Sequence, residues 1–404
     1  MKQEKIKKNN KRDDGQGTII QRTNGTYQIK LRDGKKADGK PKYKYFSGKT
    51  QAECKRKLRE YQQQQALLKD SYTDMTFNEY ADFYMYNVKY GTVKPSYFDR
   101  IEKTIRCHIK PDIGYIKMND VSTQHLQLLI NERAFPTDGK KPLARSSVKK
   151  IQEALNMIFS YAVLREHIKK NPVEGVVLPA EVNMLVKTKD MEEIQEDEIK
   201  RIVSVCNTRI KDGSRIKYRL GPLYIFLLNT GLRIGEALAL EKNDIDFEKR
   251  VVQVTKSLAT VKERDENKKA LGNKIVISPP KTKRSIRKVP LNNTAIDALQ
   301  SMIENNEKLG IKSPYIFCSN EGTLVNERNA MRAFDVILKQ AEVKHYGLHA
   351  LRHTFASRLL RKTQGRVEIV SEILGHSNTS ITYNRYVHVL ENDKFEAVSA
   401  LNSI

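Results

Sequence analysis

Four consecutive segments in the first half of this chain carry apolar residues at the spacing of one face of an α-helix. They read TFNEYADFYMYNV, KPSYFDRIEKTIRCHI, STQHLQLLINERA and RSSVKKIQEALNMIFSYAVLREH, and turn signals such as KPDIG separate them. Helices with apolar stripes must bury those stripes against one another. The region from Thr76 to Val173 is therefore predicted to be a bundle of four or five helices.

The residues before this bundle alternate apolar and polar side chains around two turn signals, Asn24-Gly25 and Asp38-Gly39. A period of two predicts a three-stranded antiparallel sheet. Thr50 and Glu53 form the capping-box pattern of a helix N-terminus, and that helix would cover one face of the sheet. The other face, rich in Lys, Arg and Gln, is expected to contact DNA, with a merely solvated charged face as the alternative.

The residues after the bundle change pattern again. The loosely patterned AEVNMLVKTKDMEE has the character of an interdomain linker, and beyond it helical segments flank the strand-like RVVQVTKSL and NKIVISPPKTKRSIRKVPL. The fold class is thus α+β and mainly α. We expect three domains: residues 1–70 with a basic tail, sheet and helix; residues 71–180 with the helical bundle; and residues 181–404, mainly helical with a small antiparallel sheet.

The charge of the chain indicates a polyanionic partner. Its 73 Lys and Arg against 48 Asp and Glu give a formal net charge of +25. Nucleic acid is a better candidate than a membrane, because the longest clear apolar run, LYIFLL, is too short to cross a bilayer and no basic segment adjoins an apolar anchor. The start MKQEKIKKNNKRDDG lacks the apolar core of a secretion signal, so an intracellular protein is expected.

Four separated motifs in the last predicted domain share residues that suit a phosphate. They are TGLRIGE around Arg233, PKTKRSIRKVPL around Lys281, LHALRHT with His349 and Arg352, and LGHS…TYNRYVH with His376 and Tyr386. Two guanidinium groups can neutralise the charge of a pentacoordinate phosphorus. A lysine can protonate the leaving alkoxide, a histidine can transfer protons, and a tyrosine whose phenolate is stabilised by arginine can attack phosphorus. Alone, these residues predict a basic phosphate-handling site with a candidate phenol nucleophile.

In this order, the motifs resemble those of the tyrosine recombinases, or phage-type integrases, and most of all the integrases of Gram-positive phages and integrative conjugative elements. The match is strongest from Gln195 to Val389. The resemblance implies integration and excision of a mobile element, such as a prophage or transposon. The reaction would pass through a 3′-phosphotyrosine and a Holliday junction and would need no metal, ATP or other cofactor. The three predicted domains would bind arm-type DNA sites, bind core-type DNA sites and carry catalysis, in that order.

The resemblance also implies partners. They are double-stranded DNA with core-type and arm-type sites, a homotetramer assembled on it, an excisionase and a host DNA-bending protein, with no membrane. The location would be cytoplasmic, at the nucleoid when DNA is bound. The amphipathic ENDKFEAVSALNSI is expected to dock on a neighbouring protomer, since so short a helix is marginal alone. Two rival functions are a type IB-like topoisomerase or resolvase and a non-catalytic DNA-binding protein.

Two tyrosines compete for the role of nucleophile. The family pattern LGH…T-x-x-x-Y-x-H aligns with Thr382, Tyr386 and His388, so Tyr386 is the expected nucleophile and Tyr383 the packing residue. A spacing one residue shorter, which some branches of the family use, would fall on Arg385. The role of His388 is unassigned.

Several other residues have two interpretations. The family's PKT pattern selects Lys281 over Lys283 and Lys288, which would instead contact backbone phosphates from a basic hairpin. Glu236 either orients an arginine or is a helix-surface or buried ion-pair residue. His349 and His353 have the i, i+4 spacing of two metal ligands but lack the Glu of a zinc motif, so no metal is expected and His353 should pack or cap.

Overall fold

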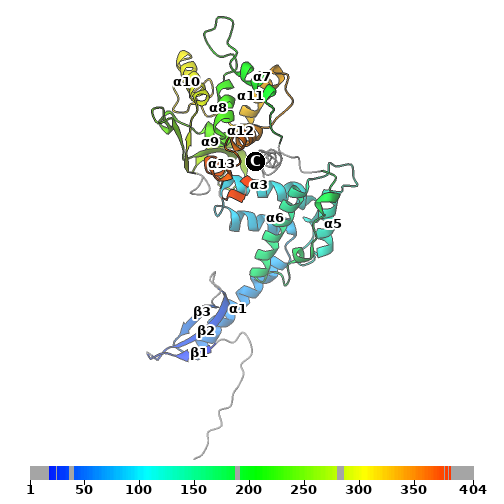
Figure 1. Ribbon diagram of the computed structural model, residues 1–404. Coiled ribbons are helices and arrows are strands. Elements are labelled where there is room, and N and C mark those ends of the chain that lie inside the picture. Colours follow the sequence, from blue (N-terminus) through cyan, green and yellow to red (C-terminus); the bar gives the residue numbers. More distant parts are fainter. Residues whose placement is uncertain are drawn as a thin grey trace, which may run out of the picture. The chain divides into compact units, whose positions relative to one another are not determined.

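The computed structural model describes residues 18–23, 25–35, 41–186, 192–279, 286–376, 378–380 and 382–383. The chain divides into two compact units. Unit 1 holds Met1–Tyr90 and Ile101–Lys187, and unit 2 holds Gly91–Arg100 and Thr188–Ile404. We describe each unit by itself (Figure 1). The division into three domains stays a prediction.

The N-terminal part of unit 1 is the predicted three-stranded sheet. Strands β1 (Thr18–Gln21), β2 (Tyr27–Lys35) and β3 (Pro41–Gly48) pair antiparallel in the order β1-β2-β3, and helix α1 (Gln51–Thr73) packs on one face. Their small core consists of Ile29, Phe46, Cys54 and Leu58. The predicted cap is confirmed, since Thr50 Oγ1 accepts the Glu53 N–H at 3.2 Å. The predicted Asp38-Gly39 turn lies outside the described residues.

The rest of unit 1 is helical, as predicted. Helix α2 (Phe77–Phe83) continues into the π-helix η1 (Tyr84–Lys89). The last residues of α3 (Pro95–Thr104) continue through the π-helix η2 (Ile105–Ile109) into α4 (Lys110–Ile113), and α5 (Thr123–Ala134) and α6 (Arg145–Leu164) follow. The 3₁₀ turns η3 (Pro172–Gly175) and η4 (Glu181–Asn183) close the unit. Each helix turns its apolar residues inward, among them Tyr80, Ile109, Leu126 and Ile158.

Unit 2 is built around one buried helix. Helix α8 (Gly221–Thr230) has the sequence GPLYIFLLNT and is apolar on all sides, which is typical of a helix surrounded by others. Around it lie α7 (Glu196–Cys206), α10 (Asn293–Lys308), α11 (Glu327–Gln340) and α12 (Leu348–Lys362), while the short α9 (Ile234–Leu238) and α13 (Val367–Leu374) follow sharp turns. These helices share one core, which includes Phe226, Leu299, Phe334 and Leu351.

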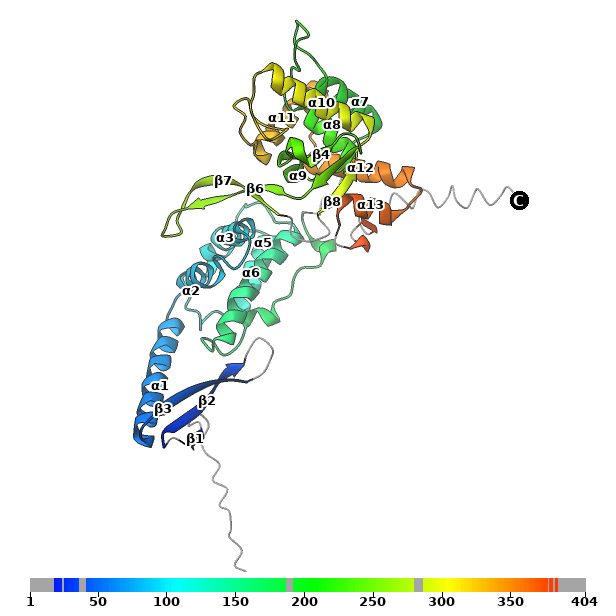
Figure 2. The same ribbon diagram turned by 90° about the vertical axis from the view of Figure 1, so that its left-hand side faces the viewer.

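The strands of unit 2 form two small antiparallel sheets instead of the single one expected. After the 3₁₀ turn η5 (Lys242–Asp244), strands β4 (Ile245–Asp246), β5 (Val251–Val254) and β8 (Arg287–Pro290) pair in the order β4-β5-β8. Strands β6 (Ser257–Arg264) and β7 (Ala270–Ser278) form a separate hairpin. Figure 2 shows this hairpin extending from the body of unit 2. The expected strand RVVQVTKSL is thus divided between the two sheets.

Candidate active site

The turn between α8 and α9 places Arg233. Helix α8 ends at Gly231, whose φ of +63° is left-handed, and a Cβ there would lie 2.3 Å from a ring carbon of Phe355, so only glycine fits. Two residues later Arg233 precedes α9. Its backbone N–H donates to Glu236 Oε2 at 2.9 Å and its Nη1 donates to Oε1 at 2.8 Å. The Arg233 side chain is 37% exposed, so it reaches the surface although its Nη1 atom is held by Glu236.

Glu236 joins two arginines inside the protein. Its side chain is 3% exposed, and Arg287 of β8 donates to its carboxylate through Nη2 at 2.9 Å and Nη1 at 3.2 Å. Burial would raise the pKa of Glu236, but the hydrogen bond and charge of Arg287 and the charge of Arg233 outweigh burial, so the pKa is lowered. Glu236 is therefore the buried ion-pair partner that the sequence proposed, and it also orients Arg233.

Arg287 extends this network to the end of α13. Its Nε donates to the Ile373 carbonyl at 2.7 Å. Gly375, two residues on, has a φ of +66°, and a Cβ there would lie 2.9 Å from Arg287 Cδ. The glycine of the LGH motif is thus needed for its conformation and for the space that Arg287 fills. Arg287 was not among the residues predicted for the site, although it lies within the lysine motif PKTKRSIRKVPL.

Arg352 lies at the centre of the site and is buried. Its Nη1 donates to the Gly231 carbonyl at 2.7 Å, and its Nη2 donates to the Leu374 carbonyl at 2.8 Å. The same Nη2 lies 3.0 Å from His376 Nε2. One guanidinium therefore connects the chain just before Arg233 with the chain just before His376.

His376 is buried and its tautomer follows from its contacts. An arginine can only donate, so the Nε2 atom that faces Arg352 must be the acceptor. The ring proton of the neutral imidazole is then on Nδ1, which lies 2.7 Å from the buried Thr382 hydroxyl. His376 thus orients Arg352 in this arrangement and is itself held by Thr382, which precedes Tyr386 by four residues in the sequence.

His349 lies on the open side of the same unit. It is the second residue of α12, three residues before Arg352, and it is exposed. It lines a cavity of about 750 Å³ whose other walls come from the β6–β7 hairpin and the first turns of α11; these include Thr260, Asn273, Asn326, Arg328 and Arg332. His349 therefore faces a space that a large polar ligand can enter. His353, one turn further along the helix, is buried, as expected of a packing residue.

The remaining sequence candidates are placed only in part. Lys281 and Tyr386 lie outside the described residues, as do Lys283 and His388, and Lys288 is exposed on β8. Tyr383 was expected to pack, and that expectation is wrong, because its side chain is 51% exposed. In the described part of the chain, no group of three His, Cys, Asp or Glu side chains could hold a metal ion.

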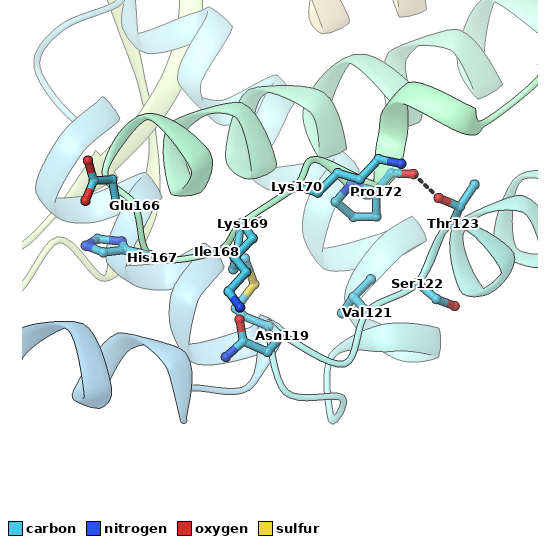
Figure 3. A pocket seen from close by; sticks show the side chains of 11 residues that line it. Asn119, Val121, Ser122, Thr123, Glu166, His167, Ile168, Lys169, Lys170 and Pro172 are labelled. Atoms are coloured by element: carbon cyan, nitrogen blue, oxygen red, sulfur yellow. Dashed lines mark hydrogen bonds between the residues drawn. The ribbon is translucent and has the colours of Figure 1, made fainter. Parts of the chain in front are cut away.

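Unit 1 has a separate hollow, shown in Figure 3, with a volume of about 560 Å³. Lys169, Lys170 and Asn119 line it, beside the start of α5, where the Thr123 hydroxyl donates to the Pro172 carbonyl at 2.8 Å. The lysines give it a basic rim, but it lacks the combination of arginine, histidine and buried carboxylate that unit 2 has. We therefore place the candidate active site in unit 2.

Solved structures of similar fold are integrases bound to DNA. An integrase of the Tn1549 transposon, in complex with transposon right-end DNA, has a TM-score of 0.63 at 22% identity, over 81% of this chain and 100% of that one. A lambda integrase tetramer bound to a Holliday junction has a TM-score of 0.54 at 17% identity, over 93% and 96% of the two chains. At these identities the similarity shows the fold.

Sequence comparisons show the family. The chain is 31% identical to a tyrosine recombinase XerC-like protein of Caldanaerobacter subterraneus, over 94% of this chain and 96% of that protein. It is 30% identical to a prophage ps2 probable integrase of Lactococcus lactis, over 71% and 72%. The model of the phage integrase family matches residues 192–393, and that of the phage integrase N-terminal SAM-like domain matches residues 76–133. This chain therefore belongs to the phage integrase family of tyrosine recombinases, enzymes that cleave and rejoin DNA.

Proposed function

We propose that this chain cleaves DNA with Tyr386 at a site formed by Arg233, Lys281, His349, Arg352 and His376. The observation that carries the proposal is the position of Arg352. Its guanidinium bonds to the carbonyls of Gly231 and Leu374, which precede Arg233 and His376 by two residues each. Three motifs that are far apart in the sequence therefore meet at one buried cation, the charge that a phosphodiester requires.

The arginines bind the scissile phosphate. The bond to Glu236 uses one of the five N–H donors of the Arg233 guanidinium, and the exposed part of that side chain can reach a phosphate oxygen. Arg352 adds a second positive charge, oriented by His376. Together they stabilise the extra negative charge of the pentacoordinate transition state and the phenolate form of Tyr386.

The chemical step is a transfer of the phosphoryl group from one oxygen to another. The Tyr386 phenolate attacks phosphorus while the bond from phosphorus to the 5′-oxygen breaks, which leaves a 3′-phosphotyrosine and a 5′-hydroxyl. His349 accepts the phenol proton, and Lys281 donates a proton to the departing 5′-oxygen. The phosphotyrosine ester preserves the bond energy for religation, so neither ATP nor a metal ion is required.

Recombination then needs a second DNA strand and more protomers. The 5′-hydroxyl of a partner strand attacks the phosphotyrosine, and two such exchanges pass through a Holliday junction. The lambda integrase tetramer on a Holliday junction supports a homotetramer as the active form. Residues 71–180 and 181–404 would bind core-type sites, and residues 1–70 would bind arm-type sites. An excisionase and a host DNA-bending protein would set direction.

The location of this activity is the bacterial cytoplasm, at the nucleoid when DNA is bound. The net charge of +25 supports a stable association with DNA. Separately, none of the helices in the described ranges has both the length and the apolar character needed to cross a membrane.

A suicide substrate tests the proposal. Full-length protein is incubated, in a chelator and without ATP, with duplexes nicked near a candidate element end, and linked peptides are mapped by mass spectrometry. We expect an adduct on Tyr386 that Tyr386→Phe and Arg233→Ala abolish, while DNA affinity changes much less. An adduct on Tyr383 would keep the enzyme class but reject the nucleophile. A bound substrate without any adduct would reject the proposal.

A further inference from the structure

The residues Gly91–Arg100, which include the start of α3, belong to unit 2 and lie against the β6–β7 hairpin. Asp99 makes the main contact. Its Oδ2 accepts the backbone N–H of Lys262 at 2.7 Å, and its Oδ1 accepts Nη2 of Arg264 at 2.7 Å. Arg264 is 4% exposed at its side chain, and its guanidinium carbon lies 5.0 Å from the centre of the Phe98 ring. One carboxylate thus binds both the backbone and a buried cation of strand β6.

The hairpin needs such a support, because an isolated two-stranded ribbon is marginally stable. At its base it packs closely on α9, where a Cβ on Gly235 would lie only 2.4 Å from the Leu258 carbonyl oxygen. Asp99 binds the opposite end, where Lys262 pairs with Asn273 and the register shifts between Glu263 and Arg264. The hairpin is therefore held at both ends.

Residues 91–100 also contact the residue that directly follows strand β7, two positions before Lys281 in the sequence. Lys94 Nζ donates to the Pro279 carbonyl at 3.2 Å. Pro279 directly follows β7 and precedes Lys281 by two residues in the sequence. Residues 91–100 therefore bind β6 and also the end of β7 from which the chain continues to Lys281.

We propose that Asp99 is a positioning residue for DNA cleavage, which fixes the β6–β7 hairpin so that Lys281 can protonate the departing 5′-oxygen. This inference rests on the proposed role of Lys281. Asp99 does not touch the reacting atoms in this scheme. Its charge and its bond to the Lys262 N–H determine how steadily the hairpin holds the chain that carries the general acid.

The test compares two leaving groups. In one substrate the scissile phosphate has its normal 5′-oxygen, and in the other a sulfur atom replaces that oxygen. A thiol is several pKa units more acidic than an alcohol, so a thiolate leaves without a proton and needs no general acid. Adduct formation is measured in single turnover at saturating full-length protein, and the readout is the ratio of the sulfur rate to the oxygen rate.

We expect Lys281→Ala to slow adduct formation with the oxygen substrate by about 10²- to 10⁴-fold and to leave the rate with the sulfur substrate unchanged. Asp99→Ala should raise the same ratio by roughly 10- to 100-fold, because the acid is misplaced and not lost. Asp99→Asn keeps an oxygen for the Lys262 N–H and should have a smaller effect. The matched control is Asp246→Asn, since Asp246 also accepts a backbone N–H, from Lys249 at 2.8 Å, in the same unit.

The outcomes separate this inference from the proposed function. If Asp99→Ala and Asp99→Asn slow both substrates equally, or neither, the inference is rejected even when Lys281→Ala behaves as expected. If Lys281→Ala leaves the ratio unchanged while Asp99→Ala raises it, Lys281 is not the acid, and Asp99 positions another one. Circular dichroism of each variant checks that it is folded. If Asp99→Ala does not fold, the ratio of the two cleavage rates measured for Asp99→Asn tests the inference.

Discussion

The Nη2 atom of Arg352 and the Nε2 atom of His376 lie 3.0 Å apart in the interior of unit 2. Because the arginine donates, the histidine is fixed with its proton on Nδ1, directed at the Thr382 hydroxyl. A chain of contacts therefore runs from Arg352, which we propose binds the scissile phosphate, to a residue four positions before Tyr386 in the sequence. If Tyr386 is the nucleophile, substitutions along this chain of contacts should change the rate of DNA cleavage.

Thr382→Val should slow cleavage while Thr382→Ser should not. Valine has the shape of threonine but no hydroxyl, so it leaves His376 Nδ1 without the oxygen now 2.7 Å away, at a cost of about 1 kcal/mol in the free energy of unfolding. Adduct formation on a suicide substrate should fall more than affinity for the same DNA. Equal rates for valine and serine would show that the hydroxyl has no part in orienting His376.

Arg352→Lys should reduce the cleavage rate by about 10²- to 10³-fold, the usual effect of losing a donor to a developing anion. Lysine keeps the charge but cannot bond to the Gly231 and Leu374 carbonyls and to His376 at once. The control is Arg358→Lys on the same helix, where Arg358 pairs with Glu196 at 2.8 Å and is partly exposed. The two variants are compared in single turnover, and an equal loss in both would contradict the central role of Arg352.

Most of the fold could be predicted because its signals are local. The periods of two and 3.6 located the N-terminal sheet and the helices, and the Thr50 cap lies within one turn of chain. The division of RVVQVTKSL between two sheets was missed, because β5 pairs with the sequence-distant β8, whereas β6 pairs with the next strand along the chain, β7. The attachment of residues 91–100 to unit 2 depends equally on distant contacts.

The site was predictable where residue chemistry alone identifies a role. Arg352 contacts His376 and the carbonyls of Gly231 and Leu374, so the segments that lead to Arg233 and His376 meet at it, while the catalytic roles of these residues stay predictions. Arg287 was missed because nothing in IRKVPL shows that its guanidinium crosses to Glu236 and to Ile373, which are 51 and 86 residues away. Tyr383 was assigned a packing role because the family pattern selects Tyr386 instead, but a motif that excludes a tyrosine from catalysis does not tell whether its side chain meets the core.

Glu236→Gln should destabilise the protein, and the effect should depend on pH. Removing one partner of a buried pair costs ~3 kcal/mol because Arg287 is left buried without its counter-charge. The pKa of Glu236 is lowered from 4.5 in the folded protein, so its contribution to stability is fully present above pH 4.5 and is lost as the pH falls through the folded-state pKa. The difference in Tm between wild type and variant should therefore be largest at neutral pH and shrink in acid.

Calorimetry across a pH series that brackets 4.5 measures this difference. The control is Glu307→Gln, because Glu307 pairs with Lys242 at 3.5 Å on the surface and should change the free energy of unfolding by no more than about 0.5 kcal/mol. A Tm difference for Glu236→Gln that stays constant from neutral to acid pH would mean that the carboxylate is not stabilised in its charged form.

Gly375→Ala should impair both stability and cleavage, whereas Gly310→Ala should affect stability alone. The two glycines have nearly the same φ, +66° and +65°, so alanine should cost about 1–2 kcal/mol at either position for the left-handed conformation. They differ in the room available to a side chain, because a Cβ on Gly375 would lie 2.9 Å from Arg287 Cδ, while a Cβ on Gly310 would meet no atom within 4 Å. The pair therefore separates the cost of the backbone conformation from the effect of displacing Arg287.

Because Arg287 binds Glu236, and Glu236 orients Arg233, displacement of Arg287 by Gly375→Ala should reach the active site and lower the rate of adduct formation at Tyr386. If both variants lose the same stability and cleave DNA equally fast, Arg287 has room to move and the network around Glu236 does not position Arg233.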